Sequence, residues 1–316
     1  MNFYTGGYGN TLNHYKNFNL SNTFNIPNAS YLCKFNNYLY AVIEQQQGKA
    51  AAFFIESDGQ LRLLNEIPTN GSAPCHLSVE GNNLYIAHYT SGTTTIIHIN
   101  ADGSLGQIQK TIDHNSFGSP SKAYPGRQEK PHAHYAQARS EGIWICDLGL
   151  DCVLLLNPEG QELKRYTVPS GDGPRHLAFH PTLNLPYVAC EMGNTIISLE
   201  HGTRVSILWE PNPKSTCAAI RVSPCGGFLL ISNRGEGSDS ISILTLENGN
   251  IGQLIDVVSA GGRCPRDFVF DPEGKKVLVA CQESNLIQTF DWQSGKLTPT
   301  GISIEVERPT CILFQD

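Results

Sequence analysis

One short unit recurs seven times along this chain, and the repetition restricts its fold more than any other feature. Each copy has a small or polar start, an apolar run, a polar turn and a second apolar run that ends in a polar residue. The copies start 42 to 57 residues apart, a period typical of supersecondary units that pack against their own copies. Six copies are continuous: SYLCKFNNYLYAVIE from Ser30, CHLSVEGNNLYIAHY from Cys75, HAHYAQARSEGIWICD from His132, RHLAFHPTLNLPYVACE from Arg175, CAAIRVSPCGGFLLISNR from Cys217 and RDFVFDPEGKKVLVACQ from Arg266. The seventh is divided, with PTCILFQD at the end of the chain and NFYTGGY at its start.

Each unit predicts a β-hairpin. Gly and Pro occupy the turns, as in HPTLN, SPCGG and DPEGK, and β-branched and aromatic residues flank them. Two further strands complete most units: we expect them over 195–200 and 204–210 after Glu191, and over 240–247 and 252–259 after Arg234. No apolar stripe of helical period persists, so no long helix is expected. Four antiparallel strands per unit, repeated radially, describe an all-β seven-bladed β-propeller.

The divided seventh copy predicts how the propeller closes. Residues 309–314 would form the innermost strand of the blade whose other strands begin at Asn2, so the N- and C-terminal strands would share one blade. This pairing removes two exposed sheet edges, which otherwise invite aggregation. We therefore predict a single domain over residues 1–316, because closed all-β folds often reach this length as one domain.

Composition indicates a soluble globular protein. The net charge of -7 argues against a nucleic-acid partner, for which a basic face is the usual footprint. The N-terminal sequence lacks the pattern of a signal peptide, and no apolar stretch approaches the length of a membrane span. The ten cysteines are then expected to be reduced thiols, and no pair has Cys-x-x-Cys spacing. We expect a cytoplasmic monomer, with seven cysteines acting as small buried apolar residues: Cys75, Cys146, Cys190, Cys217, Cys264, Cys281 and Cys311.

One polar stretch, residues 113–130 (DHNSFGSPSKAYPGRQEK), interrupts the repeat and makes that interval the longest. It could be a solvated loop between blades. It could equally be a lid over the site, because it leads directly into the sequence PHAH.

Topology predicts where the site lies. The innermost strand of each blade lines the channel and the next strand runs antiparallel to it, so the start of the first and the end of the second share one face. Ionisable or amide side chains gather at these two positions in six of the seven units. At the strand starts they are His76, His132, His134, Arg175, His176 and Arg266, and at the strand ends Glu44, His88, Asp147, Glu191, Arg234 and Gln282.

This set of side chains favours an anionic, polar small molecule. Arginine offers forked donors that suit a carboxylate or phosphate, and histidine can move protons near neutral pH. His132 and His134 alternate with Ala133, so both would point to the same side of a strand. A metal pair with a carboxylate is conceivable, but three nearby arginines would repel a cation, and we predict no metal site.

Structural roles remain open for several of these residues. Asp147 could brace its turn through backbone amides, His76 and His88 could be satisfied wall residues, Glu44 could be solvated, and Arg266 could pair with Asp267. For Glu191 and Arg234 we favour a functional role, because each ends an apolar strand where no turn requires a charge. Alanine at either position is expected to lower turnover strongly with little change in stability.

Six segments in order resemble the bacterial seven-bladed propeller lactonases, a family that includes 6-phosphogluconolactonases and resembles the carboxy-cis,cis-muconate lactonizing enzyme. They are RQEKPHAH, DLGLDCVLLL, GPRHLAFHP, CEMGNTI, SNRGEGSDSISI and PRDFVFDPEGKKVLVACQESNLI, between Arg127 and Leu297. The chain departs from the family pattern at residues 139–142, a surface hairpin, and in its Asn-rich N-terminal units.

The resemblance implies hydrolysis of a sugar lactone, in particular 6-phosphogluconolactone of the pentose phosphate pathway, without a cofactor. It implies catalytic positions for His134, Arg175, Glu191 and Arg234. Substrate-binding positions are expected at His132, His176, Arg266, Gln282 and Asp147. In the expected mechanism Glu191 or His134 activates water, Arg234 stabilises the oxyanion and Arg175 holds the anionic group. Two other functions stay open: a carboxymuconate-type cyclase, and a propeller that binds ligands or proteins without catalysis.

Overall fold

The computed structural model describes residues 1–315, and within them 28 strands form seven four-stranded antiparallel sheets. The predicted fold class, an all-β seven-bladed propeller, is confirmed. Two short 3-10 turns are the helices of the described chain, η1 (His114–Phe117) and η2 (Gln282–Ser284), as expected from the absence of helical periodicity. Among residues 1–315, no helix is long and apolar enough to cross a membrane.

The chain divides into two compact units. The N-terminal unit comprises Asn2–Pro174 together with Gln315, and the C-terminal unit comprises Arg175–Phe314 together with Met1. That residues 1–316 behave as one domain stays a prediction.

The N-terminal unit contains three complete sheets and three further strands that pair in chain order. The further strands are β1 (Asn2–Gly7), β2 (Thr11–Lys16) and β3 (Asn19–Asn25). The complete sheets are β4 (Ala29–Phe35), β5 (Tyr38–Ile43), β6 (Lys49–Ile55) and β7 (Leu61–Pro68); β8 (Pro74–Glu80), β9 (Asn83–His88), β10 (Thr93–Ile99) and β11 (Leu105–Asp113); and β12 (Ala133–Arg139), β13 (Gly142–Asp147), β14 (Cys152–Leu156) and β15 (Glu162–Thr167).

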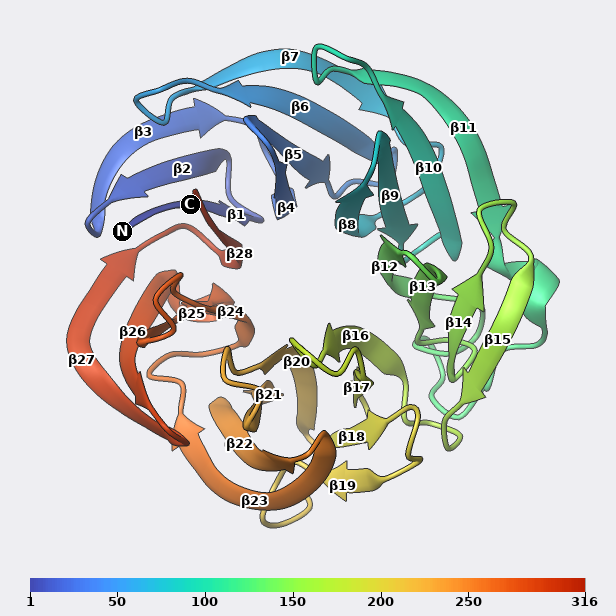
Figure 1. Ribbon diagram of the computed structural model, residues 1–316, viewed down its shortest axis with the longest axis vertical. Coiled ribbons are helices and arrows are strands. Elements are labelled where there is room, and N and C mark those ends of the chain that lie inside the picture. Colours follow the sequence, from blue (N-terminus) through green and yellow to red (C-terminus); the bar gives the residue numbers. More distant parts are fainter. Residues whose placement is uncertain (316) are drawn as a thin grey trace. The chain divides into compact units, whose positions relative to one another are not determined.

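The C-terminal unit contains three complete sheets, and Figure 1 shows their strands side by side in chain order. They are β16 (Pro174–Phe179), β17 (Pro186–Cys190), β18 (Thr195–Ser198) and β19 (Arg204–Ser206); β20 (Ser215–Val222), β21 (Phe228–Gly235), β22 (Ser240–Glu247) and β23 (Asn250–Ser259); and β24 (Pro265–Phe270), β25 (Lys276–Cys281), β26 (Leu286–Gln293) and β27 (Lys296–Glu305). The unit also holds β28 (Pro309–Phe314), with the bounds expected for the terminal strand. The strand predicted over 204–210 ends early, at Ser206.

Burial follows the place of a strand in its sheet. The second strands are buried almost throughout, as in β5 and β25, because they carry continuous apolar runs. The fourth strands alternate or are mostly exposed, as in β23 and β15. A strand covered on both faces needs an unbroken apolar sequence, whereas a strand with one wet face alternates. The core therefore lies between neighbouring sheets, as in the cluster around Phe268 and Phe290.

The two ends of the chain meet, as predicted. Within the N-terminal unit, the backbone N–H of Gln315 donates to the carbonyl of Asn2 over 2.9 Å. The Gln315 side-chain oxygen lies 3.1 Å from Nε2 of His14, and the Lys34 ammonium donates to the Gln315 carbonyl. Gln315 follows directly after β28, so the end of the chain is tied to its first strands.

A β-bulge recurs near the start of the first strand of several sheets. The pairing register skips one residue at Ser30, Cys75, His134 and Arg266. In β20 it skips two residues, Ala218 and Ala219. A bulge leaves backbone groups outside the ladder and redirects side chains, and bulges are common beside active sites.

The cysteines behave largely as predicted. All ten lie within the described residues and are free thiols. Of the seven expected to be buried, six are buried, and Cys264 is half-buried.

The stretch 113–130 is tied to the N-terminal unit. It begins with η1, whose His114 side chain is fully buried. Its other end is held by Gln128, also fully buried, whose amide donates to the Leu148 carbonyl at 2.8 Å and to the Asp151 carboxylate at 2.7 Å. These anchors fix both ends of the stretch, and a lid role stays a prediction.

Candidate active site

Glu191 lies at the centre of a buried cluster in the C-terminal unit. It follows directly after β17, and its two carboxylate oxygens face two arginines from different strands. Oε2 lies 3.0 Å from Nε of Arg175 on β16, and Oε1 lies 3.0 Å from Nη2 of Arg234 on β21. The side chains of Arg175 and Glu191 are 2% and 1% exposed, and that of Arg234 is 14% exposed. The sequence therefore predicted correctly that these three residues, distant along the chain, lie together.

Strand β20 contacts all three members of this cluster. The Thr216 hydroxyl accepts a hydrogen bond from Nε of Arg234 at 3.3 Å. The backbone N–H of Cys217 donates to the carbonyl of Glu191 at 3.0 Å. The carbonyl of Ala218, in the bulge of β20, accepts from Nη1 of Arg175 at 2.7 Å.

The cluster has an excess of positive charge. Burial, together with the neighbouring Arg234 and Arg266, lowers the pKa of Arg175 to about 10, against the opposing effect of Glu191. Arg266 is therefore close enough to act on Arg175 electrostatically. One carboxylate facing two guanidinium groups leaves a net positive charge that a bound anion would stabilise.

Three further predicted residues, His176, Arg266 and Gln282, lie in the same unit. His176 follows Arg175 on β16 and is buried. Arg266 occupies the bulge of β24. Gln282 opens η2, where its backbone N–H donates to the Cys264 carbonyl at 3.0 Å. Asp267, the partner that the sequence suggested for Arg266, forms an ion pair with Arg221 at 2.6 Å.

The Cys217 thiol beside the cluster is not a nucleophile. Burial and the neighbouring Glu191 raise its pKa to about 12, and its Sγ donates to the Cys190 carbonyl at 3.2 Å. A thiol must ionise to react, so this one stays inert near neutral pH.

In the N-terminal unit, the two histidines of the PHAH sequence gather around Tyr89. The His132 ring stacks on Tyr89 with centroids 4.4 Å apart, and the His134 ring meets it edge-on at 5.7 Å. Nδ1 of His132 lies 2.8 Å from the Tyr89 carbonyl, and Nε2 lies 3.3 Å from a carboxylate oxygen of Glu129. Both rings thus contact one aromatic side chain.

Asp147 braces its turn, the structural alternative that its sequence left open. Its Oδ1 accepts backbone N–H bonds from His132, Gly149 and Leu150 at 2.9 to 3.0 Å. Its Oδ2 lies 2.7 Å from Nδ1 of His114, and both side chains are fully buried. This carboxylate has little capacity left for a substrate, and we leave Asp147 out of the proposed binding set.

Asp147 and Glu191 occupy different positions when the repeated units are aligned. Asp147 pairs across the sheet with Ala133, as His88 pairs with Pro74 and Ile43 with Ala29. These residues occupy the last position of the second strand, and all are buried. Glu191 comes one residue after the equivalent position, Cys190, and successive strand side chains point to opposite faces.

The same alignment identifies a residue that the sequence analysis missed. Tyr89 follows β9 as Glu191 follows β17, and it is half-buried against both PHAH histidines. Arg127, from the stretch 113–130, donates from Nε to the Tyr89 hydroxyl at 2.9 Å. A strict alignment of the seven units would have selected Tyr89 in place of His88.

Comparison with known proteins assigns the chain to a family. The sequence profile described as "Lactonase, 7-bladed beta-propeller" matches residues 11–314. The chain belongs to this family. The match is longer than the resemblance seen in the sequence alone, and it includes the Asn-rich N-terminal units.

Individual members of the lactonase family are similar over nearly the whole chain. A Bacillus subtilis protein named 6-phosphogluconolactonase is 31% identical, covering 92% of this chain and 88% of its own. A Formosa agariphila protein of the same name is 33% identical, covering 88% and 86%. A crystal structure from Bacteroides fragilis superposes with a TM-score of 0.88 at 28% identity, covering 100% of this chain and 98% of that one.

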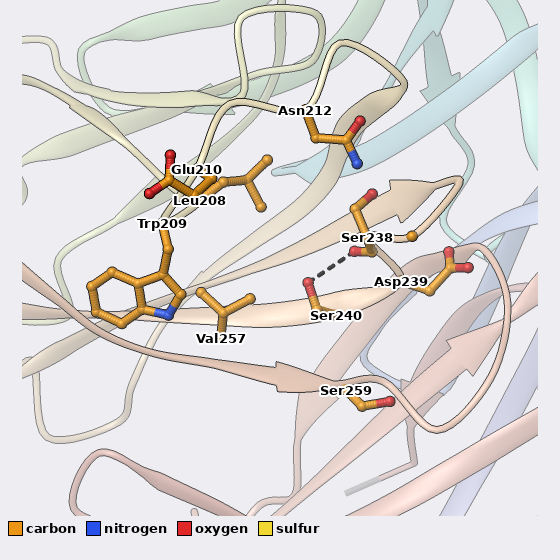
Figure 2. Close-up of a pocket in the computed structure, with 10 residues that line it drawn as sticks. Leu208, Trp209, Glu210, Asn212, Ser238, Asp239, Ser240, Val257 and Ser259 are labelled. Atoms are coloured by element: carbon orange, nitrogen blue, oxygen red, sulfur yellow. Dashed lines mark hydrogen bonds between the residues drawn. The ribbon is translucent and has the colours of Figure 1, made fainter.

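A pocket of about 520 Å³ lies elsewhere in the C-terminal unit of this lactonase (Figure 2). Its polar groups mainly hold the protein's own loops: the Asn212 side chain accepts from the Lys214 N–H at 3.0 Å, and the Ser240 hydroxyl donates to the Ser238 carbonyl at 2.8 Å. No lysine or arginine is among its lining residues, so it does not suit an anionic sugar. The lining residues are Leu208, Trp209, Glu210, Asn212, Gly237, Ser238, Asp239, Ser240, Val257 and Ser259.

Proposed function

We propose that this protein is a lactonase that hydrolyses 6-phosphogluconolactone to 6-phosphogluconate. The observation that carries the proposal is the cluster of Arg175, Glu191 and Arg234, in which one buried carboxylate faces two guanidinium groups at 3.0 Å. Two guanidinium groups beside one carboxylate favour an anionic substrate such as one that carries a phosphate. The names of the Bacillus and Formosa relatives support the same substrate.

The reaction adds water across the ester bond of the ring. A base takes a proton from water, the hydroxide attacks the lactone carbonyl, and the bond to the ring oxygen breaks. The ring oxygen leaves as an alkoxide and takes up a proton, which gives a hydroxy acid. No cofactor is needed, because the lactone carbonyl is already electrophilic and a positioned base suffices.

In this mechanism Glu191 organises the arginines and is not the base. Each of its oxygens lies 3.0 Å from a guanidinium nitrogen, and its side chain is only 1% exposed, so we assign it the role of holding the arginines. Arg234, the more exposed arginine, stabilises the oxyanion, and Arg175 with Arg266 supplies further positive charge for the phosphate. The family resemblance implies His134 as the base, and His132 or His176 as the group that donates the departing proton.

The surroundings of the reaction are also proposed. The ten free thiols favour a reducing compartment and hence the cytoplasm. We expect a monomer that binds its anionic substrate without nucleic-acid or membrane partners.

The proposal is tested by measuring lactone hydrolysis with the purified protein, corrected for spontaneous opening. We expect kcat/KM for 6-phosphogluconolactone to exceed that for gluconolactone by about tenfold or more, since a phosphate adds charge-assisted hydrogen bonds. Carboxymuconate serves as the third substrate and detects the cyclase alternative. A rate equal to the spontaneous one with every substrate would contradict the proposal.

A further inference from the structure

We propose that three consecutive residues of β20, Thr216, Cys217 and Ala218, are a positioning segment for the whole charged cluster. This inference rests on the proposed function, because it takes Arg234 and Arg175 as the groups that meet the substrate. Nothing in this segment is charged, so its role is visible only from its contacts.

Each residue of the segment holds a different member of the cluster. Thr216 accepts from Arg234 through its hydroxyl, Cys217 donates to Glu191 through its backbone N–H, and Ala218 accepts from Arg175 through its carbonyl. The segment therefore fixes the direction of both guanidinium groups and the backbone of the carboxylate between them. Arg234 needs this most, since it is the most exposed of the three.

The β-bulge makes the contact with Arg175 possible. Regular pairing of β20 with β21 stops at Cys217 and resumes at Ile220, which leaves Ala218 and Ala219 outside the ladder. The freed Ala218 carbonyl accepts from Arg175 at 2.7 Å. The freed Ala219 N–H donates to the Ser232 hydroxyl at 3.0 Å. Ser232 is fully buried, so its hydroxyl stabilises a bulge that would otherwise bury an unpaired donor.

Thr216 and Ser232 thus act on different arginines. Thr216 orients Arg234 directly, and across the sheet these two residues are register partners. Ser232 acts on Arg175 through the shape of the bulge. Substitutions at the two positions are expected to give different kinetic signatures.

The first test compares Thr216→Val, which removes the hydroxyl at similar volume, with Thr216→Ser, which keeps it. We expect Thr216→Val to lower kcat about tenfold with little change in KM, because a hydrogen bond to a charged group is lost from the oxyanion-stabilising arginine. Thr216→Ser should restore most of kcat. Thr245→Val, at a hydroxyl on β22 that accepts from the Gln253 N–H, is the matched control and should match the wild type. Equal kcat in the two Thr216 variants would overturn the assignment.

The second test uses Ser232→Ala and Ser232→Thr. We expect Ser232→Ala to raise KM by about fivefold through a looser Arg175, and Ser232→Thr to restore it in part. An unchanged KM in a folded Ser232→Ala protein would remove Ser232 and the bulge from the proposal.

A third readout does not depend on turnover. In ¹H–¹⁵N spectra, Thr216→Val should shift or broaden the Nε–H signal of Arg234 and leave that of Arg175 in place. Ser232→Ala should do the reverse. If the wild type hydrolyses no lactone but these spectral changes occur, the proposed function fails and the positioning role stands; if the spectra do not change, the positioning role is wrong.

Discussion

At the scale of single residues, the buried charges form the site and also affect the stability of the fold. The side chain of Glu191 is 1% exposed and lies between two guanidinium groups, so its removal leaves Arg175 buried with one contact fewer. The sequence predicted these residues from the starts and ends of apolar strands. Their burial could not be predicted, because it depends on how neighbouring sheets pack. We therefore now expect Glu191→Ala to lower the stability of the fold. For Arg234→Ala, at the more exposed arginine, we still expect little change in stability.

We predict that Glu191→Ala lowers the free energy of unfolding by about 3 kcal/mol, because breaking a buried ion pair leaves an uncompensated charge. Urea denaturation measures this. The matched control is Glu283→Ala, which removes a carboxylate from the exposed ion pair with Arg263 and should leave the stability nearly unchanged. Equal losses in the two variants would show that Glu191 is not held as described.

At the scale of strands, the repeat predicted hairpins and strand order well, and it predicted the bounds of β28. Two features escaped it. The bulges depend on local pairing geometry, which places His134 and Arg266 outside the regular ladder. The one-residue offset between Asp147 and Glu191 was visible in the sequence but requires strict alignment of the units, since one step along a strand turns a side chain to the other face.

The buried His88, at the end of β9, predicts how the stability of the fold depends on pH. Burial lowers the pKa of His88 to about 4, from 6.5, and its Nε2 lies 2.9 Å from the Thr69 hydroxyl. Between these two values the unfolded chain binds the proton and the folded chain does not, so stability falls as the pH drops through this window. Between about pH 7 and about pH 5 the histidine should cost about 2 kcal/mol.

Urea denaturation at both pH values, in wild type and His88→Gln, measures this contribution. Other groups titrate in the same range, so the difference between the two slopes is the relevant quantity. We expect the variant to lose less stability on acidification than the wild type. Identical slopes would mean that His88 takes up its proton equally in the folded and unfolded chain.

At the scale of the whole chain, the seven copies predicted the number of sheets. The divided copy predicted that the two ends of the chain meet, and the structure adds the contacts of Gln315 with Asn2 and His14. The repeat topology predicted the polar set, and the family resemblance added the roles of its residues. The profile match over residues 11–314 extends that resemblance along the chain. The contacts of β20 were not predictable, because an uncharged Thr-Cys-Ala sequence resembles any other strand. The account now depends on Arg175, Glu191 and Arg234 forming the place where the substrate anion binds.

A crystal structure with bound 6-phosphogluconate tests that claim most directly. We predict that an oxygen of its phosphate or carboxylate lies within hydrogen-bonding distance of the guanidinium of Arg234 or Arg175, with Glu191 still between the two arginines. A product molecule bound away from both arginines, for instance in the pocket beside Trp209, would contradict the account.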